Sequence, residues 1–238
     1  MNIRPLIYGT LAEDLPAGPL PGQFEHKKGS RVAYNSELKT KRFGLVTFVA
    51  PDPVFFYLNK AEKSINIIHE HIIEIENSKK TILFPKHKVD VIGEQKIYNF
   101  MEDAIAAIIF LFGAVEAFTN LHMPIQATYS VRCSNKNGKV VVFLNKLELE
   151  KYCCTNDKLI FLADHFKIIG IKKQNCWNTF QNINRIRNNI MHLKTYGKAS
   201  HNAYLDTYCE LIDVEHDALF RDVKKLLEIF IPTYFSLS

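Results

Sequence analysis

The spacing of apolar residues along the chain predicts a mainly helical protein. Between residues 54 and 76 the apolar positions recur at intervals of threes, fours and sevens, which is the period of one buried helix face. These positions are Phe55, Leu58, Ile65, Ile68, Ile72 and Ile75. A second helix is expected from Gln95 to His122, just before Pro124. Its centre, residues 104–115, is apolar on every side, which is typical of the core helix of a bundle.

The pattern changes its period after Pro124. β-Prone residues on both sides of an Asn-Gly pair at positions 137–138 predict a tight turn, so we expect a small β-hairpin insertion near residues 127–150. Helical patterns return in three later segments: 155–166, 174–193 and 203–230. The middle one has an apolar stripe formed by Trp177, Phe180, Ile183, Ile186 and Ile190.

The first 52 residues form the least regular part of the chain. Proline and glycine interrupt any regular element between residues 16 and 22. Residues 43–49 favour one short strand, and Pro51 and Pro53 then mark a boundary. We therefore expect an irregular N-terminal arm, residues 1–52, packed on a helical domain, residues 53–238.

Composition supports a folded domain. Hydrophobic residues make up 47% of the 238 positions, and 17 Phe and 10 Tyr favour a packed core over disorder. The five cysteines show no CxxC spacing, which favours a reducing, cytoplasmic setting. The chain starts without the apolar stretch of a secretory signal, and the apolar run at residues 104–115 is shorter than the ~20 residues that cross a bilayer, so no membrane association is expected.

The distribution of charge points to an anionic partner. The net charge is only +5, but residues 166–204 contain no Asp or Glu. The same stretch carries seven basic residues: Lys167, Lys172, Lys173, Arg185, Arg187, Lys194 and Lys198. A basic region on an otherwise near-neutral chain is typical of a local anion-binding surface, although a solvated basic face has the same composition.

The helix expected over residues 174–193 has an unusual polar face. Its apolar stripe buries one side, and the other side presents arginine, asparagine and histidine rather than the glutamate and lysine of an ordinary solvated face. Asparagine is a mediocre helix former because its amide competes for backbone hydrogen bonds. Four asparagines within residues 182–189 therefore imply a use for polar groups at this place.

The spacing of these polar residues brings several of them near His192. Asn188 and Asn189 precede it by four and three residues and share its face of the helix. Arg185 lies seven residues before it, on nearly the same side, and Arg187 has a side chain long enough to reach across. An arginine that holds an anionic oxygen and a histidine that moves a proton are the groups that phosphodiester cleavage needs.

The segment from Arg187 to His192, Arg-Asn-Asn-Ile-Met-His, resembles the R-x4-6-H motif of the HEPN superfamily, including the polar residue directly after the arginine. The resemblance implies an antiparallel helical bundle with the motif on a late helix, to which this chain adds the β-hairpin and the arm. Many HEPN proteins are metal-independent ribonucleases of toxin–antitoxin, phage-defence or RNA-processing systems. They typically dimerise so that two motifs face one cleft. The resemblance therefore implies RNA as substrate, a homodimer, and an antitoxin or another protein partner.

On this interpretation the catalytic residues are His192, Arg187 and Asn188. His192 acts as general base or acid while the ribose 2′-OH attacks the phosphate, Arg187 stabilises charge on the phosphate oxygens, and Asn188 orients the imidazole or the phosphate. Five further residues are candidates for substrate binding, three on or after the same helix and two on an earlier one: Arg185, Asn189, Lys194, Glu116 and Asn120.

Two alternatives from other classes stay open. The chain could be a non-catalytic HEPN-like module that binds RNA or a nucleotide, or a helical scaffold for protein partners. No organic cofactor is expected, because no phosphate-binding loop or dinucleotide fingerprint is present. No metal is expected either. His69 and His71 resemble a metal pair only superficially, since two helical residues this far apart point roughly 200° away from each other.

Overall fold

A computed structural model of the protein describes residues 7–10, 31–33, 35–49, 51–84, 87–124, 129–135, 138–191, 200–232 and 234–235. The chain forms two compact units, Met1–Phe56 and Tyr57–Ser238. The protein is mainly helical, as the apolar periodicity predicts. The packing of the first unit on the second stays a prediction.

The described part of the first unit contains two short antiparallel strand pairs. Strand β1 (Ile7–Thr10) pairs with β2 (Arg31–Ala33), and β3 (Asn35–Thr40) pairs with β4 (Gly44–Val49). The strand expected at residues 43–49 is confirmed. The expectation of an irregular arm is wrong for the described residues, because the helix and strand breakers at positions 16–22 fall between β1 and β2 and interrupt neither.

Helix α1 (Pro53–Ser78) begins at a proline that follows an aspartate. Proline fits the first helical position because it needs no hydrogen-bond acceptor there, and the Asp52 carboxylate accepts a hydrogen bond from the Val54 N–H at 2.9 Å. The expected apolar stripe is buried only as far as Ile68, and Ile72 is 43% exposed. The last third of the helix therefore contributes little to the core.

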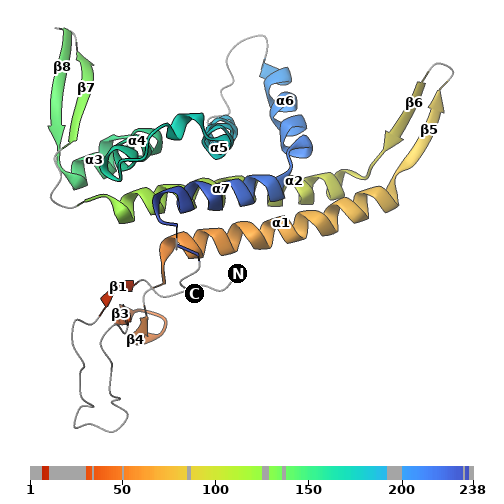
Figure 1. Ribbon diagram of the computed structural model, residues 1–238. Helices are drawn as coiled ribbons and strands as arrows, with labels where there is room; N and C mark the ends of the chain where they lie inside the picture. Colours follow the sequence, from red (N-terminus) through yellow and green to blue (C-terminus); the bar gives the residue numbers. More distant parts are fainter. Residues whose placement is uncertain are drawn as a thin grey trace. The chain divides into compact units, whose positions relative to one another are not determined.

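An unexpected β-hairpin joins α1 to the next helix. Strand β5 (Lys80–Phe84) pairs antiparallel with β6 (His87–Val91). Figure 1 shows this hairpin beyond the ends of the two helices that it connects. Each of its strands has only 5 residues, too few for an alternating apolar pattern to be recognised in the sequence.

Helix α2 (Glu94–His122) is the core helix, as its apolar centre predicts. Helix α1 lies antiparallel to α2 (Figure 1), and the His71 imidazole on α1 is 3.1 Å from the Asp103 carboxylate on α2. By length and composition alone α2 could also cross a membrane, and half of its most apolar window is buried inside the protein. A buried core helix passes the same test, so the absence of a membrane association stays a prediction.

The predicted hairpin insertion is confirmed but is shorter than expected. Strand β7 (Tyr129–Asn135) pairs with β8 (Gly138–Leu144). The residues that follow form helix α3 (Lys146–Tyr152) rather than more of the hairpin. Asn145 and Glu148 make a reciprocal capping box, in which each side chain accepts a hydrogen bond from the other residue's backbone N–H, and this starts the helix.

The described residues that follow α3 are mainly helical. They comprise α4 (Thr155–His165), the 3-10 turn η1 (Ile171–Lys173), α5 (Asn175–Met191), α6 (Ser200–Asp213) and α7 (His216–Phe230). The single helix expected over residues 203–230 is wrong: it breaks at Val214 and Glu215, where no glycine or proline signals an end. Helix α2 contacts α4, α5, α6 and α7.

The pairing of α2 with α7 is parallel, which departs from an all-antiparallel bundle. The Phe100 ring lies 6.1 Å from the His216 ring at the start of both helices, and the Phe118 ring lies 5.8 Å from the Phe230 ring near their ends. Figure 1 shows α5 end-on while α2 and α7 run across the view, so α5 crosses them steeply.

Candidate functional site

The apolar side of α5 fixes where its polar residues lie. Its buried residues are Cys176, Trp177, Phe180, Ile183 and Ile186, which confirms the predicted stripe except at Ile190, which is half-buried. Because α5 packs on α2 and α7 through this stripe, Arg185 and Asn189 point to solvent. Asn184, Arg187 and Asn188 lie between the two sides and are half-buried.

Arg187 is held against the core by an aromatic ring. Its guanidinium carbon lies 4.9 Å above the centre of the Phe112 ring on α2, and Phe112 itself stacks on Phe180 at 6.2 Å. Phe180 and Arg187 are seven residues apart, so they lie two turns apart on one side of α5 and reach the same ring. A contact of this kind stabilises by about 0.5–2 kcal/mol.

The charge of Arg187 has no acidic partner in the part of the chain that the structure describes. Its Nη1 donates to the Asn188 side-chain carbonyl at 3.0 Å, and the Asn188 amide donates in turn to the Asn184 carbonyl at 3.3 Å. Asn188, which the sequence assigns to the imidazole or the phosphate, therefore positions the guanidinium here. A half-buried cation with neutral neighbours attracts an anion more strongly than one already paired with a carboxylate.

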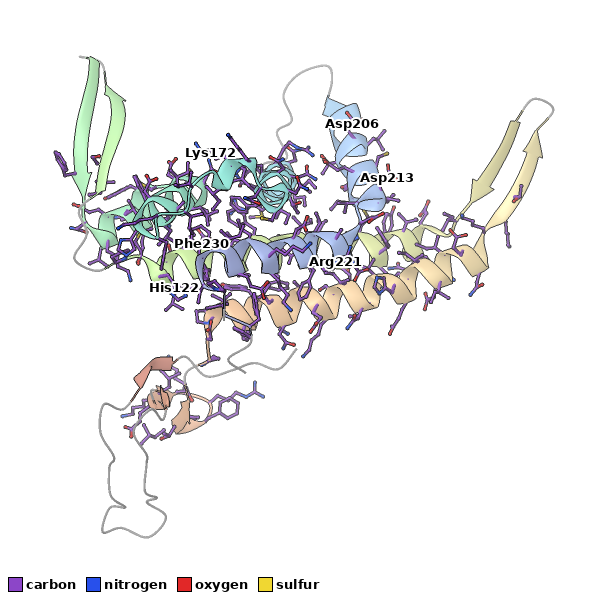
Figure 2. All side chains as sticks on the ribbon, in the orientation of Figure 1. His122, Lys172, Asp206, Asp213, Arg221 and Phe230 are labelled. Carbon is purple, nitrogen blue, oxygen red and sulfur yellow. The ribbon has the colours of Figure 1, made fainter. Side chains whose placement is uncertain are left out.

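Arg185 is such a paired arginine. It makes a two-pronged ion pair with Glu210 on α6, with one Nη1 to Oε2 distance of 2.8 Å, and its Nη2 also donates to the Asn182 carbonyl at 2.5 Å. A shallow, open hollow of about 500 Å³ on the same side is lined by three acidic residues of α6: Asp206, Glu210 and Asp213. Figure 2 labels Asp206 and Asp213. These carboxylates repel a phosphate backbone, so Arg185 is poorly placed for substrate binding.

The two candidates on α2 differ in their surroundings. The Asn120 side-chain carbonyl accepts a hydrogen bond from Lys158 at 2.9 Å, so it already has a partner. Glu116 is half-buried, and its carboxylate has no ion-pair or hydrogen-bond partner among the described residues. It follows Phe112 by one helical turn, so it lies on the side of α2 that carries the ring under Arg187.

Lys158 is a residue that sequence reasoning missed. It is 1% exposed and donates to Asn120 and, at 3.0 Å, to the backbone carbonyl of Glu150 near the end of α3. Its hydrogen bonds tie α3 and α4 to α2. This role could not be predicted from the local sequence, because Lys158 and Asn120 are 38 residues apart in sequence.

The two remaining predicted residues, His192 and Lys194, lie outside the described residues. The described part of α5 ends at Met191, whose side chain is exposed. The structure therefore places Arg187 beside Asn188 and against Phe112 of α2, whereas Arg185 is paired with Glu210 on α6.

The histidines of α1 form no metal pair. The His69 imidazole lies 2.7 Å from the Asp217 carboxylate on α7, whereas His71 reaches Asp103 on α2. Each ring thus has its own carboxylate on a different helix, as their helical spacing predicts. In the described part of the chain, no group of three or more His, Cys, Asp or Glu residues is arranged to hold a metal ion.

Comparison of the chain with protein-family models, with curated proteins and with solved structures finds no match. The resemblance to HEPN proteins therefore rests on the motif and its position on a late amphipathic helix.

Proposed function

We propose that the protein is a metal-independent endoribonuclease of HEPN type. The observation that supports this most is the state of Arg187, a half-buried guanidinium without a described carboxylate partner, on the arginine position of the R-x4-6-H motif. The stretch around it contains no acidic residue, and its neighbour Arg185 is already neutralised by Glu210. A phosphate oxygen is the anion that such a site would hold.

The proposed reaction breaks one phosphodiester bond without a covalent enzyme intermediate. The ribose 2′ oxygen attacks the adjacent phosphorus as its proton passes to a base, and the bond from phosphorus to the 5′ oxygen breaks as that oxygen gains a proton. The products are a 2′,3′-cyclic phosphate and a 5′-hydroxyl. His192 serves as the base or the acid, and Arg187, held by Asn188, stabilises the negative charge on the non-bridging oxygens.

The biological setting belongs to the same proposal. A HEPN-like bundle, a homodimer whose two motifs face one cleft, and a cytoplasmic role in a toxin–antitoxin or phage-defence system with a protein antitoxin follow from the resemblance. The position of residues 187–191 of the motif on α5, a helix packed on the core helix α2, supports such a bundle. The parallel pairing of α2 and α7 departs from the antiparallel arrangement that the resemblance implies.

The test compares two arginines in a cleavage assay on single-stranded RNA with EDTA present. Arg187→Ala removes the proposed phosphate contact and should lower the cleavage rate by about 100-fold to 1000-fold, as the loss of one stabilising donor does elsewhere. Arg221→Ala removes an exposed arginine of α7 (Figure 2) and should leave the rate unchanged. Equal rates for Arg187→Ala and wild type would refute the role of Arg187.

A second candidate function is a non-catalytic module that binds RNA or a nucleotide. It is favoured by the contacts of Arg187 with Phe112 and Asn188, since they hold the guanidinium in place to bind an anion but supply no group that moves a proton. Binding that weakens steeply with salt, together with intact RNA after long incubation, would support this function. Absence of both RNA binding and dimerisation would favour a helical scaffold instead.

A further inference from the structure

The β3–β4 hairpin exposes large apolar and basic side chains together. Phe43 is 69% exposed and Leu45 is 68% exposed, although side chains of this kind are usually covered. Residues 35–49 also contain three basic side chains and one acidic one: Lys39, Lys41, Arg42 and Glu37. The hairpin lies outside the helical unit that carries α5.

The tip of the hairpin is a turn that is closed by hydrogen bonds of the Thr40 side chain and that contains Phe43. The Thr40 hydroxyl accepts a hydrogen bond from the Phe43 N–H at 2.9 Å and donates to the Gly44 carbonyl at 3.3 Å. Gly44 has a φ of 68°, a conformation that favours glycine and closes the turn. The Arg42 guanidinium lies 5.2 Å from the centre of the Phe43 ring. One face of the ring thus meets a cation, and the high exposure of the ring leaves room at the other.

The strand register separates the apolar face of the hairpin from its tip. Leu38 and Val46 pair with each other and share one face, whereas Leu45 pairs with Lys39 on the opposite face. Phe43 and the two basic residues before it lie in the turn, outside both faces. A cation against an exposed ring favours a partner that offers both a π-face and negative charge.

We propose that the tip of the β3–β4 hairpin binds single-stranded RNA. A base stacks on the open face of Phe43, and Arg42 with Lys41 holds the flanking phosphates. Alternation of an exposed ring with cations is the combination by which single strands are bound without sequence preference. The inference rests on the RNA substrate of the proposed function, but it does not depend on cleavage at Arg187 and His192.

The experiment measures binding of a fluorescein-labelled oligouridine to the full chain by fluorescence anisotropy, with His192→Ala in every protein to prevent cleavage. Phe43→Ala should weaken binding about tenfold, because stacking of one base contributes about that factor. Phe43→Leu keeps an apolar side chain without a ring and should lose as much. Arg42→Gln should lower the salt dependence by about one phosphate contact. Tyr98→Ala removes an exposed ring of α2 and should change nothing.

Three results would overturn the inference. Undiminished RNA binding by Phe43→Ala would exclude a role for the hairpin, and full affinity of Phe43→Leu would replace stacking by simple apolar contact. Binding of phosphatidylserine vesicles but not RNA, lost on Phe43→Ala, would make the hairpin a membrane contact. Cleavage is assayed separately with His192 present. Binding that needs Phe43 in a chain that does not cleave would leave the hairpin proposal standing and refute the nuclease.

Discussion

Protonation of His216 should cost the helical unit a measurable part of its stability. His216 is the first residue of α7, is 6% exposed and lies edge-on against Phe100 at 6.1 Å. Its Nε2 is buried and has no hydrogen-bond partner among the described residues. Burial lowers the pKa of His216 from its ordinary 6.5 to about 4, and the charge of nearby His69 adds to this while Asp217 opposes it.

The sign and size of the effect follow from the two pKa values. Between pH 6.5 and pH 4 the unfolded chain binds a proton at this residue and the folded chain does not, so stability falls as the pH falls. Each pH unit in this window costs about 1.4 kcal/mol. At pH 5 the loss relative to pH 7.5 is therefore about 2 kcal/mol from this one imidazole.

The assay is urea unfolding of wild type and His216→Phe at pH 7.5 and pH 5. Phenylalanine keeps a ring against Phe100 but cannot take up a proton. Carboxylates and other histidines titrate in both proteins, so the difference between the two pH-induced changes isolates His216. We expect wild type to lose about 2 kcal/mol more than the variant. An equal loss in both proteins would show that His216 is solvated or hydrogen-bonded in the folded state, contrary to the structure.

Three further predictions concern the helices and their assembly. Asn145→Ala should cost about 1 kcal/mol in thermal unfolding because it removes the capping box of α3, and an unchanged midpoint would contradict that contact. Gly113→Leu should cost about 1–3 kcal/mol, since even a Cβ at this position would lie 3.2 Å from the Tyr57 ring. Gly113→Ala should cost less, because the ring then has to shift only slightly and alanine favours a helix over glycine. A leucine variant as stable as wild type would place the ring elsewhere. Light scattering at micromolar concentration should show a dimer, and a strict monomer would argue against a two-motif cleft.

The helices could be predicted because their apolar period is local. Phe180, Ile183 and Ile186 are three residues apart, and that spacing alone fixes the buried side of α5. The β7–β8 hairpin could be predicted for the same reason, from its Asn-Gly turn. The break between α6 and α7 could not be predicted, because Asp213, Val214 and Glu215 include neither glycine nor proline.

The state of each candidate residue could not be predicted, because it depends on partners far away in sequence. Glu210 neutralises Arg185 from 25 residues away, and the sequence gives no reason to prefer this pair over one with Arg187. The partner of Arg187 is the Phe112 ring on α2, which sequence analysis treated only as part of an apolar core. Spacing along one helix showed which residues are neighbours, but not which of them form an ion pair or a ring contact with another helix.

The central claim is that His192 and Arg187 together cleave RNA without a metal. The most direct measurement is the chemical nature of the product ends after incubation of single-stranded RNA with wild type and with His192→Ala, both with EDTA. The account predicts 2′,3′-cyclic phosphate and 5′-hydroxyl ends from wild type and uncut RNA from the variant. Cleavage by His192→Ala at the rate of wild type, or intact RNA in both reactions, would contradict it.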